Sequence, residues 1–199
     1  MNLWWLTVSG TGLIILSASI AKAREPAIGP GEARVFHAVN GLPNFLFPLL
    51  WPVMQLGNLA VGTAAGLLVA IVDRDFTVAV GVILAMVFKL VTERVVRRKM
   101  ADHLAVRQRP GTSEVDAIVR GKDVPRSGPS FPSGHIILVA AVGTVVAPNL
   151  PAAWWWVPAV LMILVMVGRV YVGAHNPLDV TAGLGAGLLL GGILAAFVN

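Results

Sequence analysis

The chain has 199 residues, of which 56% are hydrophobic and 13% charged, and it contains no cysteine. Soluble domains carry about 25% charged residues, so the composition excludes an ordinary soluble domain and indicates one membrane-embedded helical domain over residues 1–199. The lack of cysteine excludes disulfides and thiolate metal sites. The net charge of +5 does not indicate a nucleic acid partner, because the positive residues cluster beside apolar segments without interleaved aromatic residues.

Six charge-free apolar stretches predict the fold class, an all-α polytopic membrane protein with six transmembrane helices. About 20 apolar residues cross a bilayer core. The stretches are Leu3–Ile20, Asn44–Val72, Phe76–Phe88, Ile136–Val146, Trp154–Gly168 and Val180–Val198. The fourth is short unless its flanking residues are included. The first lacks the positive residues that open a signal peptide, so we expect it to be retained as a span.

The segments around the first three stretches carry further local patterns. Phe36, Val39 and Leu42 recur at helical spacing, which predicts a short helix at the membrane interface. The second stretch is longer than one span needs, and its prolines and glycines predict an interfacial entry, a kink and then the span. The third stretch is expected to continue as a helix into a basic segment, where Lys89 and Glu93 are four residues apart and can pair.

The segment Gly128–His135 reads Gly-Pro-Ser-Phe-Pro-Ser-Gly-His and leads directly into the fourth apolar stretch. Its prolines hold the preceding residues out of the helical region, and Ser133 is a good N-cap. A helix that begins here directs free N–H groups and the positive end of its dipole at the space before it, which suits an anion. His135 lies in the first turn, and histidine exchanges protons readily near neutral pH. Alone, the pattern is equally typical of a plain loop-to-helix junction.

A second polar segment, Arg169–Asp179, lies between the last two apolar stretches. An arginine, a histidine and an aspartate are costly to keep where a span meets water, so function is the default interpretation. Asn176 can cap the last helix with Pro177 in its first position, and His175 then lies within side-chain reach of Asp179. A histidine held by a carboxylate has one protonated ring nitrogen and one that is free as a nucleophile.

Spans of alternating direction bring these polar segments together. The end of the third span, the start of the fourth, the end of the fifth and the start of the sixth lie on one side of the membrane. We therefore expect one membrane face to carry Arg109, Ser133, His135, Arg169, His175 and Asp179. In the last stretch, glycines recur at every fourth position from Gly183 to Gly191, which predicts close helix packing.

Pro132–His135, followed by Arg169, His175 and Asp179 at their spacing, resembles the motif set of the type 2 phosphatidic acid phosphatase (PAP2) superfamily. The resemblance extends from the third apolar stretch to the sixth. Each motif alone is only weakly specific for this family. The two motifs together, in this order and on one membrane face, are strongly specific for it.

The resemblance implies a PAP2-like helical core and a bacterial membrane lipid phosphatase that needs no metal and no cofactor. In this family pattern His175 attacks phosphorus and forms a phosphohistidine, and Asp179 orients it. His135 protonates the leaving lipid oxygen and then activates water, a form of acid–base help worth about 10²–10⁴ in rate. The residues implied to hold the phosphoryl oxygens are Arg109, Arg169, Ser133, Gly134 through its backbone N–H, and Lys99.

Two positions depart from the family pattern. The last motif usually begins with serine where Gly168 stands, so one phosphate contact is expected to be missing or supplied by the backbone. The first motif, which ends at Arg109, usually has lysine at the position of Asp102. Lys99 is the nearest upstream lysine, and Lys89 is a more remote candidate.

The implied substrate is a membrane lipid phosphate: a polyprenyl phosphate or diphosphate, phosphatidylglycerol phosphate or phosphatidic acid. A phosphotransferase is a variant of the same class, and a lipid-phosphate binding or transport protein with a decayed active site is the alternative. A vanadate-dependent haloperoxidase shares the motifs but is expected to be soluble. Positive residues concentrate on the motif-bearing side of this cell-membrane protein, which predicts a cytoplasm-facing active site. The oligomeric state stays open.

Overall fold

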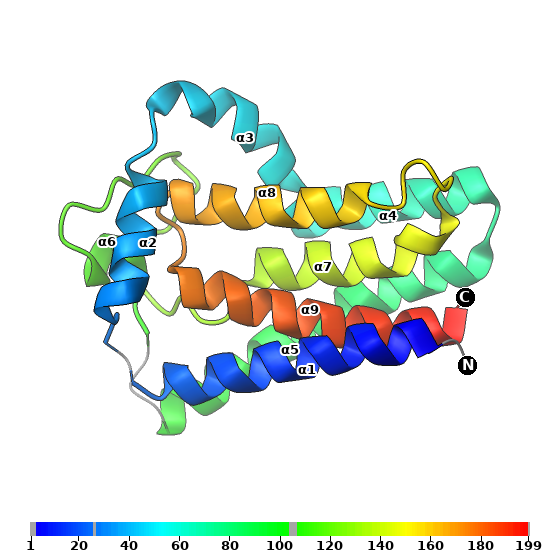
Figure 1. Ribbon diagram of the computed structural model, residues 1–199, viewed down its shortest axis with the longest axis horizontal. Coiled ribbons are helices and arrows are strands. Elements are labelled where there is room, and N and C mark those ends of the chain that lie inside the picture. The colour runs from blue at the N-terminus through cyan, green and yellow to red at the C-terminus, as the bar shows by residue number, and fades with distance from the viewer. Residues whose placement is uncertain (1–2, 26, 104–106, 199) are drawn as a thin grey trace.

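A computed structural model describes residues 3–25, 27–103 and 107–198, without the side chains of residues 3, 96, 97 and 99–103. The described residues form a helical bundle with both chain ends at one end and a layer of loops and short helices at the other (Figure 1). The long helices are α1 (Leu3–Ala23), α4 (Leu59–Asp73), α5 (Phe76–His103), α7 (Gly134–Val146), α8 (Val157–Tyr171) and α9 (Pro177–Val198). The shorter ones are α2 (Pro30–Asn40), α3 (Phe47–Met54), α6 (Pro110–Ser113) and three 3₁₀ turns, Asn44–Leu46, Gln55–Gly57 and Ala147–Asn149.

Helix α7 lies at the centre of the bundle, in contact with α4, α5, α8 and α9 (Figure 1). Every residue of α7 except His135 is buried. A helix that is apolar on all sides is expected in such a position, because no face of it meets water. The polar exception, His135, stands in the first turn, at the end of the bundle where the polar loops gather.

The glycines of α9 allow two helices to approach it closely. A Cβ atom on Gly187 would lie 2.5 Å from Cβ of Ala140 in α7, and Gly183 and Gly191 face α7 in the same way. On another face of α9, a Cβ atom on Gly185 would lie 2.5 Å from the backbone nitrogen of Leu16 in α1. The predicted packing role of the glycine series is therefore confirmed, because any side chain at these positions would force the helices apart.

The six-span prediction is confirmed only in part. Among the described residues, three helices are long and apolar enough to cross a membrane: Trp4–Ala23, Phe76–Val95 and Pro177–Val198. The pair Asn44–Gly57 and Leu59–Asp73, bent by 74°, makes a fourth if it is counted as one span. Helices α7 and α8 have only 13 and 15 residues. At about 1.5 Å per residue they are shorter than a bilayer core of about 30 Å.

The kink expected in the second stretch lies between α3 and α4. Gln55–Gly57 forms a 3₁₀ turn, and the chain then changes direction at Asn58. The Asn58 side-chain oxygen accepts hydrogen bonds from the backbone N–H groups of Ala60 at 3.0 Å and Val61 at 3.5 Å, which caps α4. The bend sends α3 outward from the bundle (Figure 1) and leaves Gly57 facing α7.

At the opposite end from the chain termini, α2 crosses the bundle and the long loop after α5 folds over it (Figure 1). Phe36 of the predicted interfacial helix is fully buried. Arg120 anchors the loop, since its Nη1 donates hydrogen bonds to the carbonyl oxygens of Asn40 at 2.8 Å and Tyr171 at 2.7 Å. The ends of the helices that carry the candidate segments lie together here, because α5, α7, α8 and α9 alternate in direction as expected (Figure 1).

Candidate active site

His175 lies in the short loop between α8 and α9 and is 3% exposed. Its Nδ1 atom is 2.9 Å from the carbonyl oxygen of Ser130 and 3.9 Å from Oδ2 of Asp179. Because a carbonyl oxygen can only accept, Nδ1 carries the proton and Nε2 keeps its lone pair. The direct hydrogen-bond partner of His175 is therefore a backbone carbonyl rather than the expected carboxylate of Asp179.

Burial and two neighbouring cations keep His175 neutral. Removal from water is the largest cause that lowers the pKa of His175 well below its ordinary value, and the positive charges of Arg169 and Arg109 lower it further. A neutral imidazole with a free Nε2 is the form that can attack phosphorus. The cations that favour this form are also candidates to bind the anionic substrate.

Asp179 is completely buried in the first turn of α9, where backbone and side-chain donors hold its carboxylate. The backbone N–H of Asn176 donates to Oδ2 at 2.9 Å, and Arg107 Nε donates to Oδ1 at 3.2 Å. The first contact closes the helix start, as expected for an acidic residue in the first turn. Asp179 thus fixes the turn that carries His175, so it acts on His175 through the loop as well as through space.

Glu32 of α2 enters the same network from outside the bundle. Its Oε1 accepts hydrogen bonds from Arg107 Nη2 at 2.6 Å and from the backbone N–H of Leu178 at 2.9 Å. The side chain of Arg107 is 1% exposed and that of Glu32 is 6% exposed. Sequence reasoning missed both roles, because no local pattern links Glu32 to residues 75 and 146 positions away.

His135 is placed by the bend between α3 and α4. A Cβ atom on Gly57 would lie 2.6 Å from Cβ and 2.8 Å from Cδ2 of His135, so the imidazole lies directly against this glycine. The charges of Arg169, Lys89 and Arg109 all act on His135. The two histidines therefore share the influence of Arg109 and Arg169, and His135 also acts on His175.

Of the predicted phosphate-binding residues, Arg109 and Arg169 act on both histidines, and Ser133 and Gly134 directly precede His135. Arg109 is 9% exposed and donates from Nη1 to the carbonyl oxygen of Ala174 at 2.8 Å. Arg169 Nε and Ser133 Oγ are buried and make no hydrogen bond within the described part of the chain. Buried polar atoms without partners are rare in native proteins and indicate a role such as ligand binding. Gly134 begins α7, where first-turn N–H groups have no intrahelical acceptor.

The structure bears on the two departures from the family pattern. A Cβ atom on Gly168 would lie 2.5 Å from Cγ of Met54, so close contact between α8 and α3 leaves no room for serine there. The side chain of Lys99 lies outside the described residues. Lys89 is confirmed to pair with Glu93, with Nζ 2.7 Å from Oε2, and its charge acts on His135.

This arrangement combines a neutral nucleophilic imidazole, a second histidine and two arginines at the end of a membrane bundle. Such a set can transfer a phosphoryl group, because one histidine can attack, the other can exchange a proton, and the arginines can stabilise the charge on phosphorus-bound oxygens. The chemistry needs an anionic substrate that reaches the polar end of an apolar bundle.

Comparison with the solved structure of LpxE supports a shared fold. LpxE of Aquifex aeolicus superimposes with a TM-score of 0.70 over 82% of this chain and 93% of LpxE, at 21% sequence identity. The first transmembrane PAP2 type phosphatidylglycerolphosphate phosphatase from Bacillus subtilis matches 98% of this chain and 92% of that chain, at 25% identity and a TM-score of 0.39.

Sequence comparison gives the family. The undecaprenyl-diphosphatase of Sulfolobus acidocaldarius is 44% identical over 55 residues, which are 27% of this chain and 26% of that protein. The match therefore spans about a quarter of that relative. The family model of the PAP2 superfamily matches residues 75–199, which include both histidines and both arginines of the site. With more than half of its length matched, the chain belongs to the PAP2 superfamily.

Proposed function

We propose that the protein hydrolyses a membrane lipid phosphate or diphosphate through a phosphohistidine formed on His175, with no metal ion in the reaction. Membership of the PAP2 superfamily supports hydrolysis of lipid phosphates. The observation that carries the intermediate is the hydrogen bond from Nδ1 of His175 to the Ser130 carbonyl, because it leaves Nε2 as the nucleophile.

The proposed reaction has two steps. In the first, the Nε2 lone pair of His175 forms a bond to phosphorus and the bond from phosphorus to the leaving lipid oxygen breaks. His135, which enters this step as an imidazolium, gives that oxygen its proton and becomes neutral. In the second, water attacks phosphorus, His135 takes its proton, and inorganic phosphate leaves Nε2. Arg109 and Arg169 stabilise the charge on the other phosphoryl oxygens, which is the main requirement of phosphoryl transfer.

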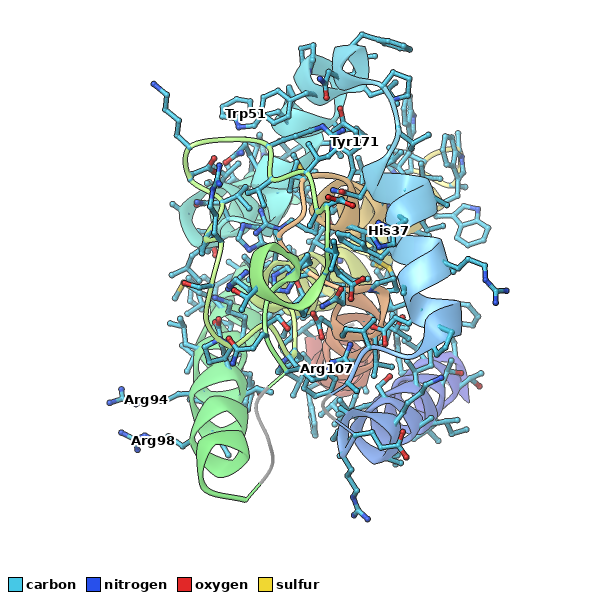
Figure 2. The ribbon with its side chains drawn as sticks, turned by 90° about the vertical axis from the view of Figure 1, so that its left-hand side faces the viewer. His37, Trp51, Arg94, Arg98, Arg107 and Tyr171 are labelled. Atoms are coloured by element: carbon cyan, nitrogen blue, oxygen red, sulfur yellow. The ribbon has the colours of Figure 1, made fainter. Side chains whose placement is uncertain are left out.

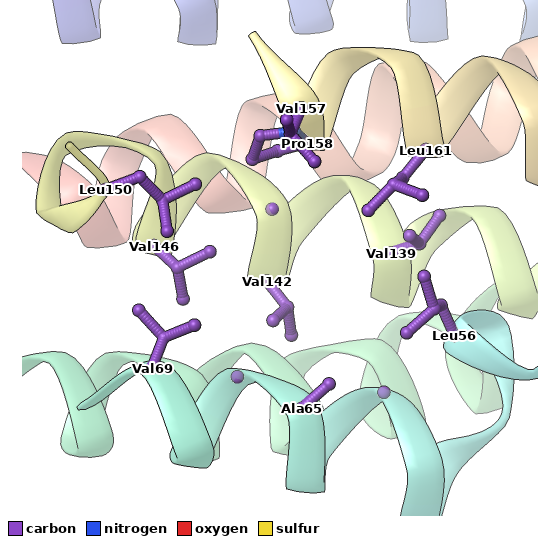
Figure 3. Close-up of a pocket in the computed structure, with 13 residues that line it drawn as sticks. Leu56, Ala65, Val69, Val139, Val142, Val146, Leu150, Val157, Pro158 and Leu161 are labelled. Carbon is purple, nitrogen blue, oxygen red and sulfur yellow. The ribbon is translucent and has the colours of Figure 1, made fainter. Parts of the chain in front are cut away.

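An apolar groove beside the site offers a place for the lipid tail. It lies between α4, α7 and α8 and is lined by Ala65, Val69, Val142 and Leu161 among others (Figure 3). Its lining includes Leu56, the residue before the Gly57 that lies against His135. A tail in this groove would therefore lead to the polar end of the bundle, where the phosphate would meet the arginines.

The substrate class we favour is polyprenyl phosphate or diphosphate, with phosphatidylglycerol phosphate and phosphatidic acid as the other candidates. The relative with 44% local identity is named for its action on undecaprenyl diphosphate, which supports the polyprenyl class. The alternative function is lipid-phosphate binding or transport without catalysis. The Nε2 lone pair of His175 and the Ser133 hydroxyl, which has no hydrogen-bond partner among the described residues, favour catalysis.

Phosphate release by the purified protein tests this function. The protein in detergent with EDTA would be given a panel of lipid phosphates, beside the His175→Ala variant. We expect metal-independent release that is lost in the variant. Release from no lipid, or equal release by the variant, would instead favour binding or transport.

We also propose that six segments cross the membrane, with α7 and α8 counted as spans, and that the active site faces the cytoplasm. Surface cations such as Arg34, Arg94 and Arg98 gather at the site end, which the positive-inside rule places in the cytoplasm. The chain has no cysteine, so Ser127→Cys in the exposed loop gives a single thiol. Labelling of this thiol by an impermeant reagent in intact cells would contradict the assignment.

A further inference from the structure

Lys89 and Glu93 form an ion pair on an inward side of α5. Lys89 Nζ is 2.7 Å from Glu93 Oε2, and the two side chains are only 13% and 16% exposed. By contrast, Arg94 and Arg98 on the same helix are exposed and extend away from the bundle (Figure 2). A charged pair held inward at the end of a membrane helix is a candidate for function.

The carboxylate of Glu93 lies against the first turn of α7. A Cβ atom on Gly134 would lie 2.9 Å from Cδ and from both carboxylate oxygens of Glu93. The start of a helix favours a negative charge, because the first N–H groups lack intrahelical acceptors. An anionic side chain therefore occupies the neighbourhood of Gly134 and His135, where the anionic part of a substrate would also be stabilised.

The pair lies on the His135 side of the site. Arg109 and Arg169 act electrostatically on both histidines, and Lys89 joins them among the cations that act on His135. Glu93, the partner of Lys89, lies against the residue next to His135. In the proposed reaction His135 protonates the leaving oxygen, so Lys89 would face the leaving group rather than the transferred phosphoryl group.

We propose that Lys89 and Glu93 form the subsite for the proximal phosphate of a lipid diphosphate. This inference rests on the proposed phosphatase function and makes it more specific. When a diphosphate is cleaved, the bond from the distal phosphorus to the bridging oxygen breaks as Nε2 of His175 bonds to the distal phosphorus. The leaving group is then a lipid monophosphate, which takes a proton from His135 on the bridging oxygen.

Lys89 neutralises the remaining charge of that leaving phosphate. To do so, its ammonium group leaves the ion pair with Glu93 and pairs with a phosphate oxygen. A monophosphate substrate leaves as an alcohol and presents no such charge, so Lys89 contributes little to its cleavage. The pair therefore sets the preference between the two substrate classes, and Glu93 holds Lys89 in place until a diphosphate displaces it.

The test compares kcat/KM for farnesyl diphosphate and farnesyl phosphate, which share one tail. In Lys89→Met we expect the ratio of the two values to fall about 10- to 100-fold, the equivalent of one lost hydrogen bond to a charged group. Arg94→Met is the matched control, because it removes an outward cation from the same helix and should leave the ratio unchanged. Glu93→Gln frees Lys89 from its ion pair and should raise the ratio.

The ratio does not depend on the fraction of folded enzyme, so a variant that is only less stable leaves it unchanged. Equal loss of both activities in Lys89→Met, no loss of either, or wild-type enzyme that cleaves only the monophosphate would overturn the subsite. If Lys89→Met does not fold, Glu93→Gln decides, and an unchanged ratio in that variant overturns the proposal. Wild-type enzyme that cleaves neither substrate would instead overturn the phosphatase function itself.

Discussion

Glu32 Oε1 lies 2.6 Å from Nη2 of Arg107, and Arg107 Nε lies 3.2 Å from Oδ1 of Asp179. Helix α2, outside the membrane bundle, thus holds the carboxylate that fixes the turn carrying His175. Glu32 lies outside residues 75–199, the part of the chain matched by the PAP2 family model. The consequence is that α2, although remote in sequence, is part of the machinery that positions His175.

Glu32→Ala should destabilise the protein and lower its activity. Removal of one partner from a buried ion pair costs about 3–5 kcal/mol, and here it leaves the Arg107 guanidinium buried with Asp179 alone. Thermal unfolding in detergent and lipid phosphate hydrolysis measure the two effects. Glu25→Ala, which changes an exposed acidic residue just before α2, serves as the control and should alter neither. Wild-type stability in Glu32→Ala would contradict the network.

Ser133→Ala should separate activity from stability. The Ser133 hydroxyl is fully buried and has no hydrogen-bond partner in the described part of the chain. Such an unsatisfied group costs about 1–3 kcal/mol, so its removal should leave stability equal or higher. If the hydroxyl binds the phosphoryl group, kcat should fall by about 10²-fold, as for loss of a donor to developing charge.

The exposed Ser127→Ala is the comparison for this variant and should leave both properties unchanged. A Ser133→Ala protein with full activity would show that the hydroxyl does not contact the substrate. A protein with less stability would show that the hydroxyl has a partner in the folded state.

The titration of His175 should set a pH dependence of stability. Because burial and two arginines lower its pKa in the folded protein, the unfolded chain binds a proton here at a higher pH than the folded chain does. Stability therefore falls as the pH drops below about 6.5, the ordinary value for histidine. His175→Gln should weaken this dependence, measured as the slope of the unfolding free energy against pH. The same slope in both proteins would contradict the lowered pKa.

A larger side chain in the apolar groove should impair only long-tailed substrates. Ala65 lines the groove (Figure 3), whereas the neighbouring Ala64 is exposed on the outer side of α4. We expect Ala65→Phe to raise KM for a polyprenyl phosphate and to leave hydrolysis of a short water-soluble phosphate ester unchanged. Ala64→Phe should change neither. Equal effects of Ala65→Phe on both substrates would exclude the groove as the tail site.

The sequence predicted the features that depend on local patterns. Apolar stretches predicted a helical membrane bundle, and alternating directions placed Arg109, His135, Arg169 and His175 at one end, as the structure confirms. The kink before α4 and the glycine contacts of α9 were also predicted, because prolines and repeated small residues act on their own helix or its direct neighbour. Catalytic roles of these residues stay predictions for the experiments above.

Only the tertiary structure decided which groups complete the site. Three contacts join groups that are far apart in the sequence. The carbonyl of Ser130 accepts from His175, Glu32 binds Arg107, and Gly57 lies against His135. No local pattern marks a backbone carbonyl or an ordinary surface-type glutamate for such a contact. The span count was confirmed only in part for a related reason. Helix α7 is enclosed by other helices. Its length is therefore set by packing against protein and need not match the thickness of the bilayer.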